Sequence, residues 1–343
     1  MLGKSGLYLI TDEREVGYLT GYRSADGFVV FDEEDKLFFI DSRYYYAVKK
    51  QLGYKWDVRL GSKKEALEYI QKTGKRLFVD YRYTTLAFNE NLKALGIDTE
   101  DCSKEIESMM IIKSPAEIKK IKKACGVAER AFKNTLKVLK VGMTESQVAA
   151  YLENQFRVLG ASGVSFETIV AFGSGSAVPH YQTGKKELQP ETVVLMDFGC
   201  VVDGYCSDMT RTFYFGLKPD KEFLNVYNAV LTAHLKTFEK ARAGMAWADV
   251  DKIARDSLTD AGYGKFFTHS LGHGVGVNIH EAPSLSPKGQ GTLENGMVHS
   301  IEPGVYLNGK FGVRIEDTDY IENGVCKSFM TFTKKLVKIK PQY

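Results

Sequence analysis

The chain has 343 residues, a formal net charge of +3 and 44% hydrophobic residues. This length exceeds the usual size of one domain, so we expect two domains, each large enough to bury its own core. The small net charge and the lack of a basic block argue against nucleic acid as a partner.

Cysteines and apolar runs bear on the compartment. The five cysteines are odd in number and form no CxxC or histidine-spaced cluster, which argues against a disulfide framework and a zinc ribbon. The N-terminal residues MLGKSGLYLITDERE lack the apolar core of a signal peptide, and no run of about 18 apolar residues occurs. We therefore expect reduced thiols, no membrane contact and a cytoplasmic protein.

The first third of the chain alternates strand and helix patterns. GFVVFDEEDKLFFID at 27–41 predicts a hairpin, and RYYYAVKKQL directly after it predicts a helix. RLFVD at 76–80 is typical of a buried strand, and TTLAFNENLKALG of a helix that ends at Gly96. We expect an α/β domain over residues 1–113.

A strong helix start marks the boundary to a second domain, residues 114–343. Ser114 can cap a helix with Pro115 in its first turn, and Glu117 completes a capping box. The apolar residues that follow recur at helical spacing and predict a stripe that faces the core.

The second domain contains a pattern that repeats at an offset of 102 residues. VGMTESQVAAYLENQFRVLG at 141–160 aligns with AGMAWADVDKIARDSLTDAG at 243–262. Each copy is followed by a stretch with glycine and histidine and by a hairpin that carries two acids. We interpret this as an internal duplication whose halves face each other across one site. A chance alignment of a few aliphatic residues is the alternative.

The first hairpin, VVLMDFGCVVDGYCSDMTRTF, brings two acids together. The Asp-Gly pair at 203–204 is a strong two-residue turn and fixes a register in which Asp197 faces Thr210. Asp208 then lies on the same face as a diagonal neighbour of Asp197. Two carboxylates among apolar residues would repel unless a cation or proton intervenes, which favours a metal. A surface pair of Asp208 with Arg211 is the alternative.

The second hairpin, MVHSIEPGVYLNGKFGVRIEDTDY, repeats the arrangement with a longer loop. If Leu307 pairs with Val313, Glu302 faces Thr318 and Glu316 is again a diagonal neighbour on the same face. The two hairpins then contribute four acids to one site.

Histidines lie between and before these hairpins. THSLGHGVGVNIHE carries His269, His273 and His280, and His180 follows the turn GSGSAVP of the first half. Beside four carboxylates, one nitrogen ligand and several groups that handle protons or oxyanions are the favoured interpretation. A core histidine, or for His180 an exposed loop histidine, is the alternative.

An oxygen-rich ligand set with one imidazole suits Mn²⁺, Fe²⁺, Co²⁺ or Zn²⁺. Because carboxylates can bridge, four of them with one histidine can hold two ions about 3.5–4 Å apart.

Several motifs of the chain resemble those of a known family. DFG with an Asp eleven residues on, HxxGHGxGxxxHE, IEPG and GVRIED look like the pita-bread metallopeptidases, which include Xaa-Pro aminopeptidases, prolidases and methionine aminopeptidases. YLTGYRSADGFVVF and DSRYY resemble the creatinase-type N-terminal domain of the proline-specific branch. The resemblance implies an α/β N-terminal domain and an α+β pita-bread catalytic domain.

The resemblance also implies roles for single residues. In the substrate pocket, His180, His269 and His280 would hold the scissile carbonyl and the oxyanion, Glu302 would act as general base toward a bridging hydroxide, and Arg314 would anchor the site electrostatically. The implied metal ligands are Asp197, Asp208, His273, Glu302 and Glu316, with Asp208 and Glu316 bridging.

The activity implied is hydrolysis of the Xaa-Pro bond of short peptides with proline in second position, by a homodimer with two ions, foremost Mn²⁺. Some short prolidases carry an Arg at the position of Ser284, which would bind the carboxylate of a dipeptide. Its absence favours an aminopeptidase over a dipeptidase, although Arg314 or a partner subunit could substitute. Methionine aminopeptidase, a metal-free creatinase-type amidinohydrolase and a non-catalytic peptide-binding relative are the alternatives.

Overall fold

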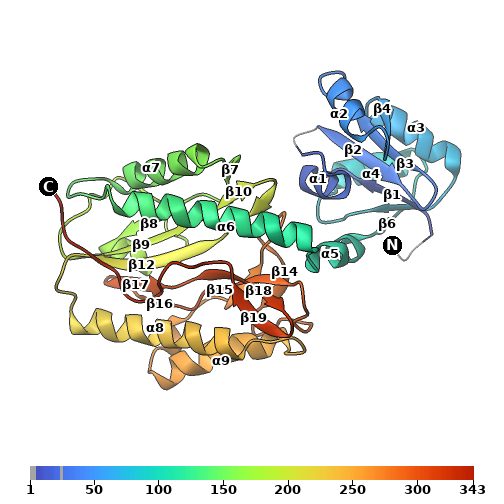
Figure 1. The fold of residues 1–343 in the computed structure, drawn as a ribbon. Coiled ribbons are helices and arrows are strands. Elements are labelled where there is room, and N and C mark those ends of the chain that lie inside the picture. Colours follow the sequence, from blue (N-terminus) through green and yellow to red (C-terminus); the bar gives the residue numbers. More distant parts are fainter. Residues whose placement is uncertain (1–4, 24–25) are drawn as a thin grey trace. The chain divides into compact units, whose positions relative to one another are not determined.

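The computed structural model describes residues 5–23 and 26–343, so positions 24 and 25 of the YLTGYRSADGFVVF segment and the first four residues lie outside the description. The chain divides into two compact units, residues 1–110 and 111–343 (Figure 1). Each unit is described by itself.

Unit 1 is an α/β unit, as the alternating pattern predicts. Within its described part, six strands form one mixed sheet in the order β4-β3-β2-β1-β5-β6. The hairpin predicted at 27–41 is present, with Val29 opposite Phe38. The helices and strands are β1 (Leu7–Ile10), α1 (Glu13–Thr20), β2 (Gly27–Phe31), β3 (Lys36–Ile40), α2 (Tyr45–Leu52), β4 (Asp57–Leu60), α3 (Lys63–Thr73), β5 (Leu77–Val79), α4 (Leu86–Ala94), β6 (Thr99–Asp101) and α5 (Ser103–Ile111).

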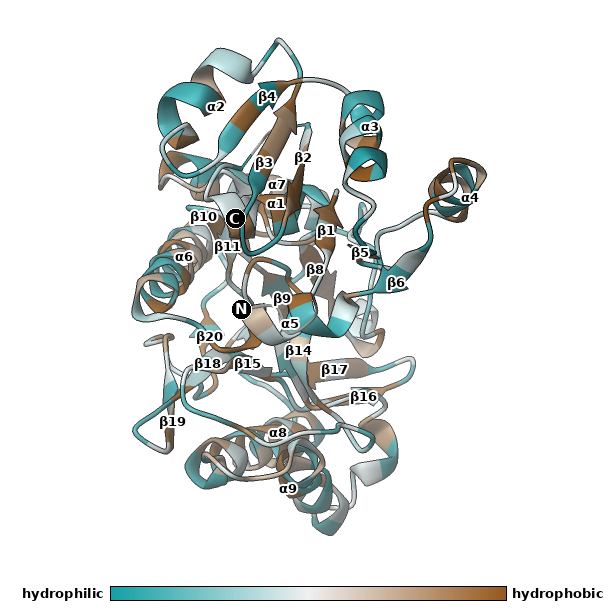
Figure 2. Ribbon diagram, turned by 90° about the vertical axis from the view of Figure 1, so that its right-hand side faces the viewer, coloured by the Kyte–Doolittle hydropathy of each residue, from teal (hydrophilic) through white to brown (hydrophobic). Residues whose placement is uncertain are grey.

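Unit 2 is layered around largely antiparallel sheets. Figure 1 shows α6 and α7 on one side of the strands and α8 and α9 on the other. Figure 2 shows teal and brown bands on α6, α8 and α9, which match the amphipathic pattern of a helix that covers a core. The helices are α6 (Pro115–Leu136), α7 (Glu145–Val158), α8 (Lys221–Lys240) and α9 (Trp247–Asp260), with short 3₁₀ turns η1 (Gly173–Ala177) and η2 (Gly264–Phe266).

The strands of unit 2 form sheets in the orders β20-β12-β9-β8, β14-β13-β15-β18-β19, β11-β10-β7 and β16-β17. They are β7 (Gly163–Val164), β8 (Ile169–Phe172), β9 (Thr192–Phe198), β10 (Cys200–Val202), β11 (Tyr205–Cys206), β12 (Met209–Phe215), β13 (Gly272–Gly274), β14 (Glu281–Leu285), β15 (Val298–Ile301), β16 (Gly304–Leu307), β17 (Phe311–Arg314), β18 (Asp317–Glu322), β19 (Val325–Ser328) and β20 (Lys338–Ile339).

The start of α6 confirms the predicted capping box. The Ser114 side chain accepts from the backbone N–H of Glu117, and the Glu117 carboxylate accepts from the N–H of Ser114. Pro115 stands in the first turn, where its missing N–H has no helical partner to lose. The apolar stripe after it is buried from Ile121 onward.

The internal duplication is confirmed element by element. Helices α7 and α9 start and end at positions that differ by 102 residues. Before each helix, a glycine adopts a left-handed conformation, Gly142 at φ 85° and Gly244 at φ 84°. The N–H of Gly142 donates to the carbonyl of Leu188 at 2.9 Å, and that of Gly244 to Leu293 at 2.8 Å. Unit 2 therefore consists of two related halves.

The register of the first hairpin is confirmed. Asp197 lies opposite Thr210, and the same register continues to the turn at 203–204. Between the two parts of the hairpin, a Cβ at Gly199 would collide with the carbonyl oxygen of Ser207, so only glycine fits there.

The register predicted for the second hairpin is wrong by two residues. Leu307 pairs with Phe311 instead of Val313, and Thr318 lies opposite Ser300 instead of Glu302. The reason is a three-residue loop in which Gly309 takes the left-handed conformation at φ 75°. A shift of two residues keeps every side chain on its face, so the predicted direction of the acids survives.

Candidate metal centre and peptide site

One cavity in unit 2 collects the residues predicted for the site. Its volume is about 570 Å³, and both halves of the duplication contribute to its wall. Every predicted site residue lines it: His180, Asp197, Asp208, His269, His273, His280, Glu302, Arg314 and Glu316, with Ser284 at the same wall.

The acids stand where strands end or break. Asp197 lies near the end of β9, and Asp208 directly precedes β12. Glu302 follows β15, where Pro303 cannot donate to a sheet ladder. Glu316 lies in the gap between β17 and β18. Asp208, Glu302 and Glu316 therefore stand outside the regular strands, whereas Asp197 reaches the cavity from within β9.

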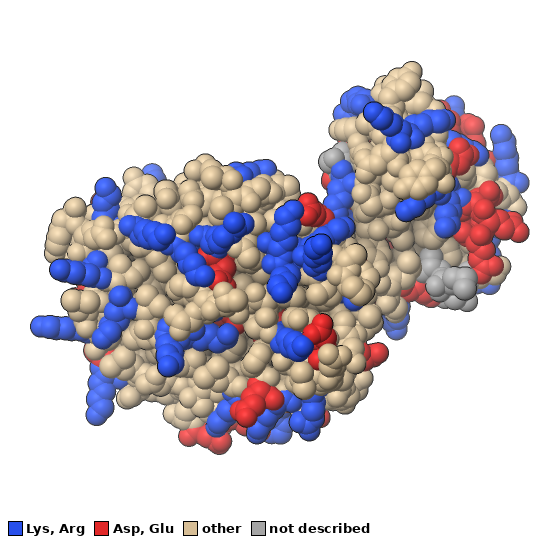
Figure 3. All heavy atoms as spheres, viewed as in Figure 1, with Lys and Arg blue, Asp and Glu red and all other residues tan. Residues whose placement is uncertain are grey.

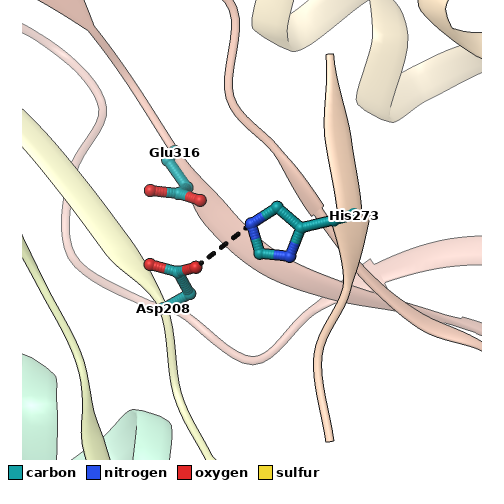
Figure 4. Close-up of side chains that lie close together, drawn as sticks. All are labelled: Asp208, His273 and Glu316. Atoms are coloured by element: carbon teal, nitrogen blue, oxygen red, sulfur yellow. Dashed lines mark ion pairs between the residues drawn. The ribbon is translucent and has the colours of Figure 1, made fainter. Parts of the chain in front are cut away.

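Three of the predicted ligands form a compact cluster. One ligand atom from each of Asp208, His273 and Glu316 lies within 4.8 Å of the others, and Figure 4 shows the three side chains pointing toward one another. His273 Nε2 lies 3.5 Å from Asp208 Oδ2 and 3.4 Å from Glu302 Oε1. The group can thus enclose an ion from both halves.

The tautomer of His273 suits a metal ligand. Its Nδ1 lies 3.1 Å from the carbonyl oxygen of Gly274, which can only accept, so Nδ1 carries the proton. Burial lowers the pKa of His273 to about 4, and the ring is therefore neutral at pH 7. The bare Nε2 lone pair faces two carboxylates, an arrangement that a cation between them would stabilise.

The electrostatics of the acids also fit a cation. Burial, together with the neighbouring carboxylates, raises the pKa of Asp208 and of Glu316 well above their usual values. Burial likewise raises the pKa of Glu302 to about 8. Asp197 Oδ1 and Glu316 Oε1 are buried without a hydrogen-bond partner. Unpaired buried oxygens of this kind are costly, and bound divalent ions would satisfy them.

Arg314 holds the acids in place from within the wall. Its Nη2 donates to Asp197 Oδ2 at 2.6 Å, its Nε to Thr210 Oγ1 at 3.0 Å, and its Nη1 to the hydroxyl of Tyr306 at 2.7 Å. The Thr210 hydroxyl donates in turn to Glu316 Oε2 at 2.6 Å. Arg314 therefore connects an acid of the first half with an acid of the second.

His269 is held by hydrogen bonds at both ring nitrogens. Nδ1 lies 2.7 Å from the carbonyl of Ser270, and Nε2 lies 2.9 Å from the Tyr306 hydroxyl. Burial lowers the pKa of His269 to about 4. The ring lines the cavity as a neutral group whose polar atoms are already engaged.

His180 and His280 differ from His269 and His273 in being more exposed to solvent. Both side chains are exposed and line the cavity. His280 packs edge-on against His273 with ring centroids 4.3 Å apart, and burial lowers its pKa. These two imidazoles, one from each half, are accessible to a bound molecule.

The sequence alone did not point to two residues that shape the site. Tyr306 bridges His269 and Arg314, yet it stands among apolar strand residues with no motif of its own. Glu145, in the first turn of α7, accepts from the N–H groups of Phe172 and Gly184 and from the Tyr181 hydroxyl. Its carboxylate thereby fixes the loop that carries His180. An acid in a first helical turn is common, so the sequence offered no signal for this role.

Comparisons with known proteins identify the family and the fold. The family described as Metallopeptidase family M24 matches residues 119–323, and the Creatinase/Prolidase N-terminal domain matches residues 4–112. The chain belongs to metallopeptidase family M24. Among solved structures, an Xaa-Pro dipeptidase from Bacillus anthracis has a TM-score of 0.93 at 32% identity, covering 97% of this chain and 95% of that one. This confirms the pita-bread fold with a creatinase-type N-terminal domain.

Further relatives are similar over nearly the whole chain. An X-Pro aminopeptidase from Thermotoga maritima has a TM-score of 0.90 at 32% identity, covering 97% of each chain. A peptidase from Staphylococcus epidermidis is 37% identical over 328 residues, covering 92% of each chain. Among the described residues, no helix has the length and apolar character that a bilayer crossing requires.

Proposed function

We propose that this metallopeptidase hydrolyses the Xaa-Pro bond at the N-terminus of short peptides with a pair of divalent ions. The convergence of Asp208, His273 and Glu316 in one cavity carries the proposal, because it joins acids of both hairpins to one imidazole. Asp197 and Glu302 complete the proposed ligand set. Mn²⁺ is our first choice of ion, with Co²⁺, Zn²⁺ and Fe²⁺ compatible with the same donors. The family resemblance also supports a homodimer.

The proposed proline preference rests on the proteins to which the chain is similar. Its N-terminal domain matches the creatinase/prolidase type, and the similar solved structures are named as Xaa-Pro dipeptidase and X-Pro aminopeptidase. These points favour Xaa-Pro cleavage over removal of N-terminal methionine.

The chemistry divides between the ions and the protein. Divalent ions, when bound, polarise a carbonyl and acidify a water molecule. Glu302, whose Oε1 lies 3.4 Å from His273 Nε2 at the cavity, can as a carboxylate take up the proton of the attacking water and pass it to the leaving nitrogen. His180 and His280, exposed at the cavity, can donate to the developing oxyanion. Arg314 holds the Asp197 carboxylate in place through its 2.6 Å hydrogen bond.

The wall of the cavity favours longer peptides over dipeptides. Arg314 is the one Lys or Arg among its lining residues, and its guanidinium is engaged by Asp197, Thr210 and Tyr306. Ser284, which is exposed, donates to Ser286 Oγ and carries no charge. Among the described residues, the cavity lining therefore offers no free cation for the carboxylate of a dipeptide, which supports an Xaa-Pro aminopeptidase over an Xaa-Pro dipeptidase.

The test compares three substrates with the Mn²⁺-loaded protein: an Xaa-Pro dipeptide, an Xaa-Pro-Xaa tripeptide and a Met-Ala peptide. We expect kcat/KM to be highest for the tripeptide. A higher value for the dipeptide would overturn the aminopeptidase assignment, and a higher value for Met-Ala would overturn the proline preference.

A further inference from the structure

A buried ion pair lies directly behind the cavity. Lys113 Nζ lies 2.6 Å from Glu281 Oε1, and the two side chains are only 1% and 8% exposed. Lysine is normally a surface residue, and Figure 3 shows Lys and Arg side chains spread over the face drawn. Neither Lys113 nor Glu281 lines the cavity. The pair is therefore outside the reaction chemistry.

Glu281 is fitted tightly into the loop that carries His280. Its Oε2 accepts from the N–H of Asn278 at 3.2 Å. A Cβ on Gly276 would collide with the Glu281 carboxylate, so glycine there makes room for this acid. The carboxylate thus closes the 276–281 segment on itself, one residue after His280.

Lys113 supplies a fixed point for that loop. Its backbone N–H donates to the carbonyl of Gly296 at 2.9 Å, and its Nζ also donates to the carbonyl of Ile111 at 3.2 Å. The next residue, Ser114, caps α6. The ammonium group therefore ties the His280 loop to the start of α6 and to the segment that enters β15.

We propose that the Lys113–Glu281 pair is a positioning device that holds His280 at the peptide site. The His280 ring packs against His273 on one side and is otherwise exposed, and the ion pair fixes the backbone next to the ring. This inference rests on the proposed Xaa-Pro peptidase activity. Lys113 and Glu281 then affect turnover only by keeping His280 in position.

The experiment is a double-mutant cycle with the holoenzyme. The double variant K113M/E281Q removes both charges and keeps both shapes, which avoids leaving one buried charge unpaired. We expect it to fold, with a loss of about tenfold to a hundredfold in kcat/KM for an Xaa-Pro-Xaa tripeptide, because small misplacements of a catalytic group have effects of this size. In the H280A background the same two changes should alter kcat/KM less than about twofold.

A second readout keeps the test independent of residual activity. With Zn²⁺ as the bound ion, the NMR signals of the His280 ring should shift between wild type and the double variant, whereas those of His234, buried in α8, should stay unchanged. K310M, which breaks the exposed Lys310–Glu222 pair, is the matched control and should change neither activity nor spectrum.

Two results would overturn different claims. Equal losses of kcat/KM with and without His280, or an unchanged His280 signal, would contradict the positioning role while the proposed function stands. Wild-type protein without any Xaa-Pro hydrolysis would remove the proposed function and this inference together.

Discussion

The two halves of unit 2 share one frame and supply different chemistry to the cavity. In the first half, β9 runs unbroken to Phe198, and the half contributes two aspartates and the exposed His180. In the second half, the matching strand stops at Ile301 because Pro303 cannot donate to a ladder. This half contributes two glutamates and three histidines from its glycine-rich segment. A common frame thus fixes where groups converge, and local breaks in the strands decide which groups they are.

The largest effects are expected from substitutions in the ligand set, because the proposed ion site needs acids from both halves. Asp208→Asn in the first half and Glu316→Gln in the second should each lower kcat/KM by at least about a hundredfold and reduce bound metal. Metal analysis and tripeptide hydrolysis measure both effects. Asp203→Asn, in the exposed hairpin turn where Asp203 pairs with Lys123, is the matched control and should behave as wild type. A Glu316→Gln variant with full metal content would show that one half suffices.

The halves use acids at different positions to hold their histidine loops. Glu145 of α7 fixes the His180 loop, whereas the corresponding position of α9 is Trp247 and the acid in the His280 loop is Glu281. Glu145→Gln turns an amide N–H₂ toward backbone donors and should cost about 1–3 kcal/mol of unfolding free energy, with a lower kcat/KM. Urea denaturation measures the first effect. Unchanged stability would mean that the loop is held by other contacts.

Helices α6 and α8 of the two halves should differ in how their stability depends on pH. At the offset of 102, Phe132 corresponds to His234, and the neighbouring Thr135 and Thr237 make the same hydrogen bonds to the carbonyls of Ala131 and Ala233. Burial lowers the pKa of His234 from 6.5 to about 3.

The sign of the pH effect follows from this shift. The folded state binds fewer protons at His234 than the unfolded state, so His234 costs stability as pH falls from 6.5 toward 3. The variant His234→Phe carries the residue of the first half and does not titrate at this position. The urea midpoint of the variant minus that of wild type should therefore be larger at pH 4 than at pH 8. Parallel pH profiles of the two proteins would contradict this.

The smallest expected effect concerns the paired turns before α7 and α9. Gly142 and Gly244 both have a left-handed backbone, and a Cβ on either would meet open space. Replacement by alanine should therefore cost only backbone strain, about 1 kcal/mol, and equally in both variants. Thermal unfolding measures the two costs, and a clear difference between them would show that the halves are not equivalent at this turn.

Local signals in the sequence were sufficient for much of the fold. The capping box of Ser114, the turn at 203–204 and the repeated glycines each depend on a few neighbouring residues, so their patterns predict structure directly. The register of the second hairpin was not predictable in this way, since the sequence Asn308-Gly309-Lys310 allows loops of different length.

The site was partly predictable for a related reason. Acids and histidines at strand ends form recognisable motifs, and all of them line the cavity. Tyr306, Glu145 and the Lys113–Glu281 pair act through contacts between residues far apart in the chain, which leave no periodic pattern. Such contacts become visible only when the fold is known.

The most direct test of the account is hydrolysis of an Xaa-Pro-Xaa tripeptide by one preparation, measured before chelation, after removal of metal, and after Mn²⁺ is restored. We predict release of the N-terminal residue that disappears with the metal and returns with it, with about two ions bound per chain at full activity. Turnover that persists in the metal-free protein would contradict the proposed metal centre.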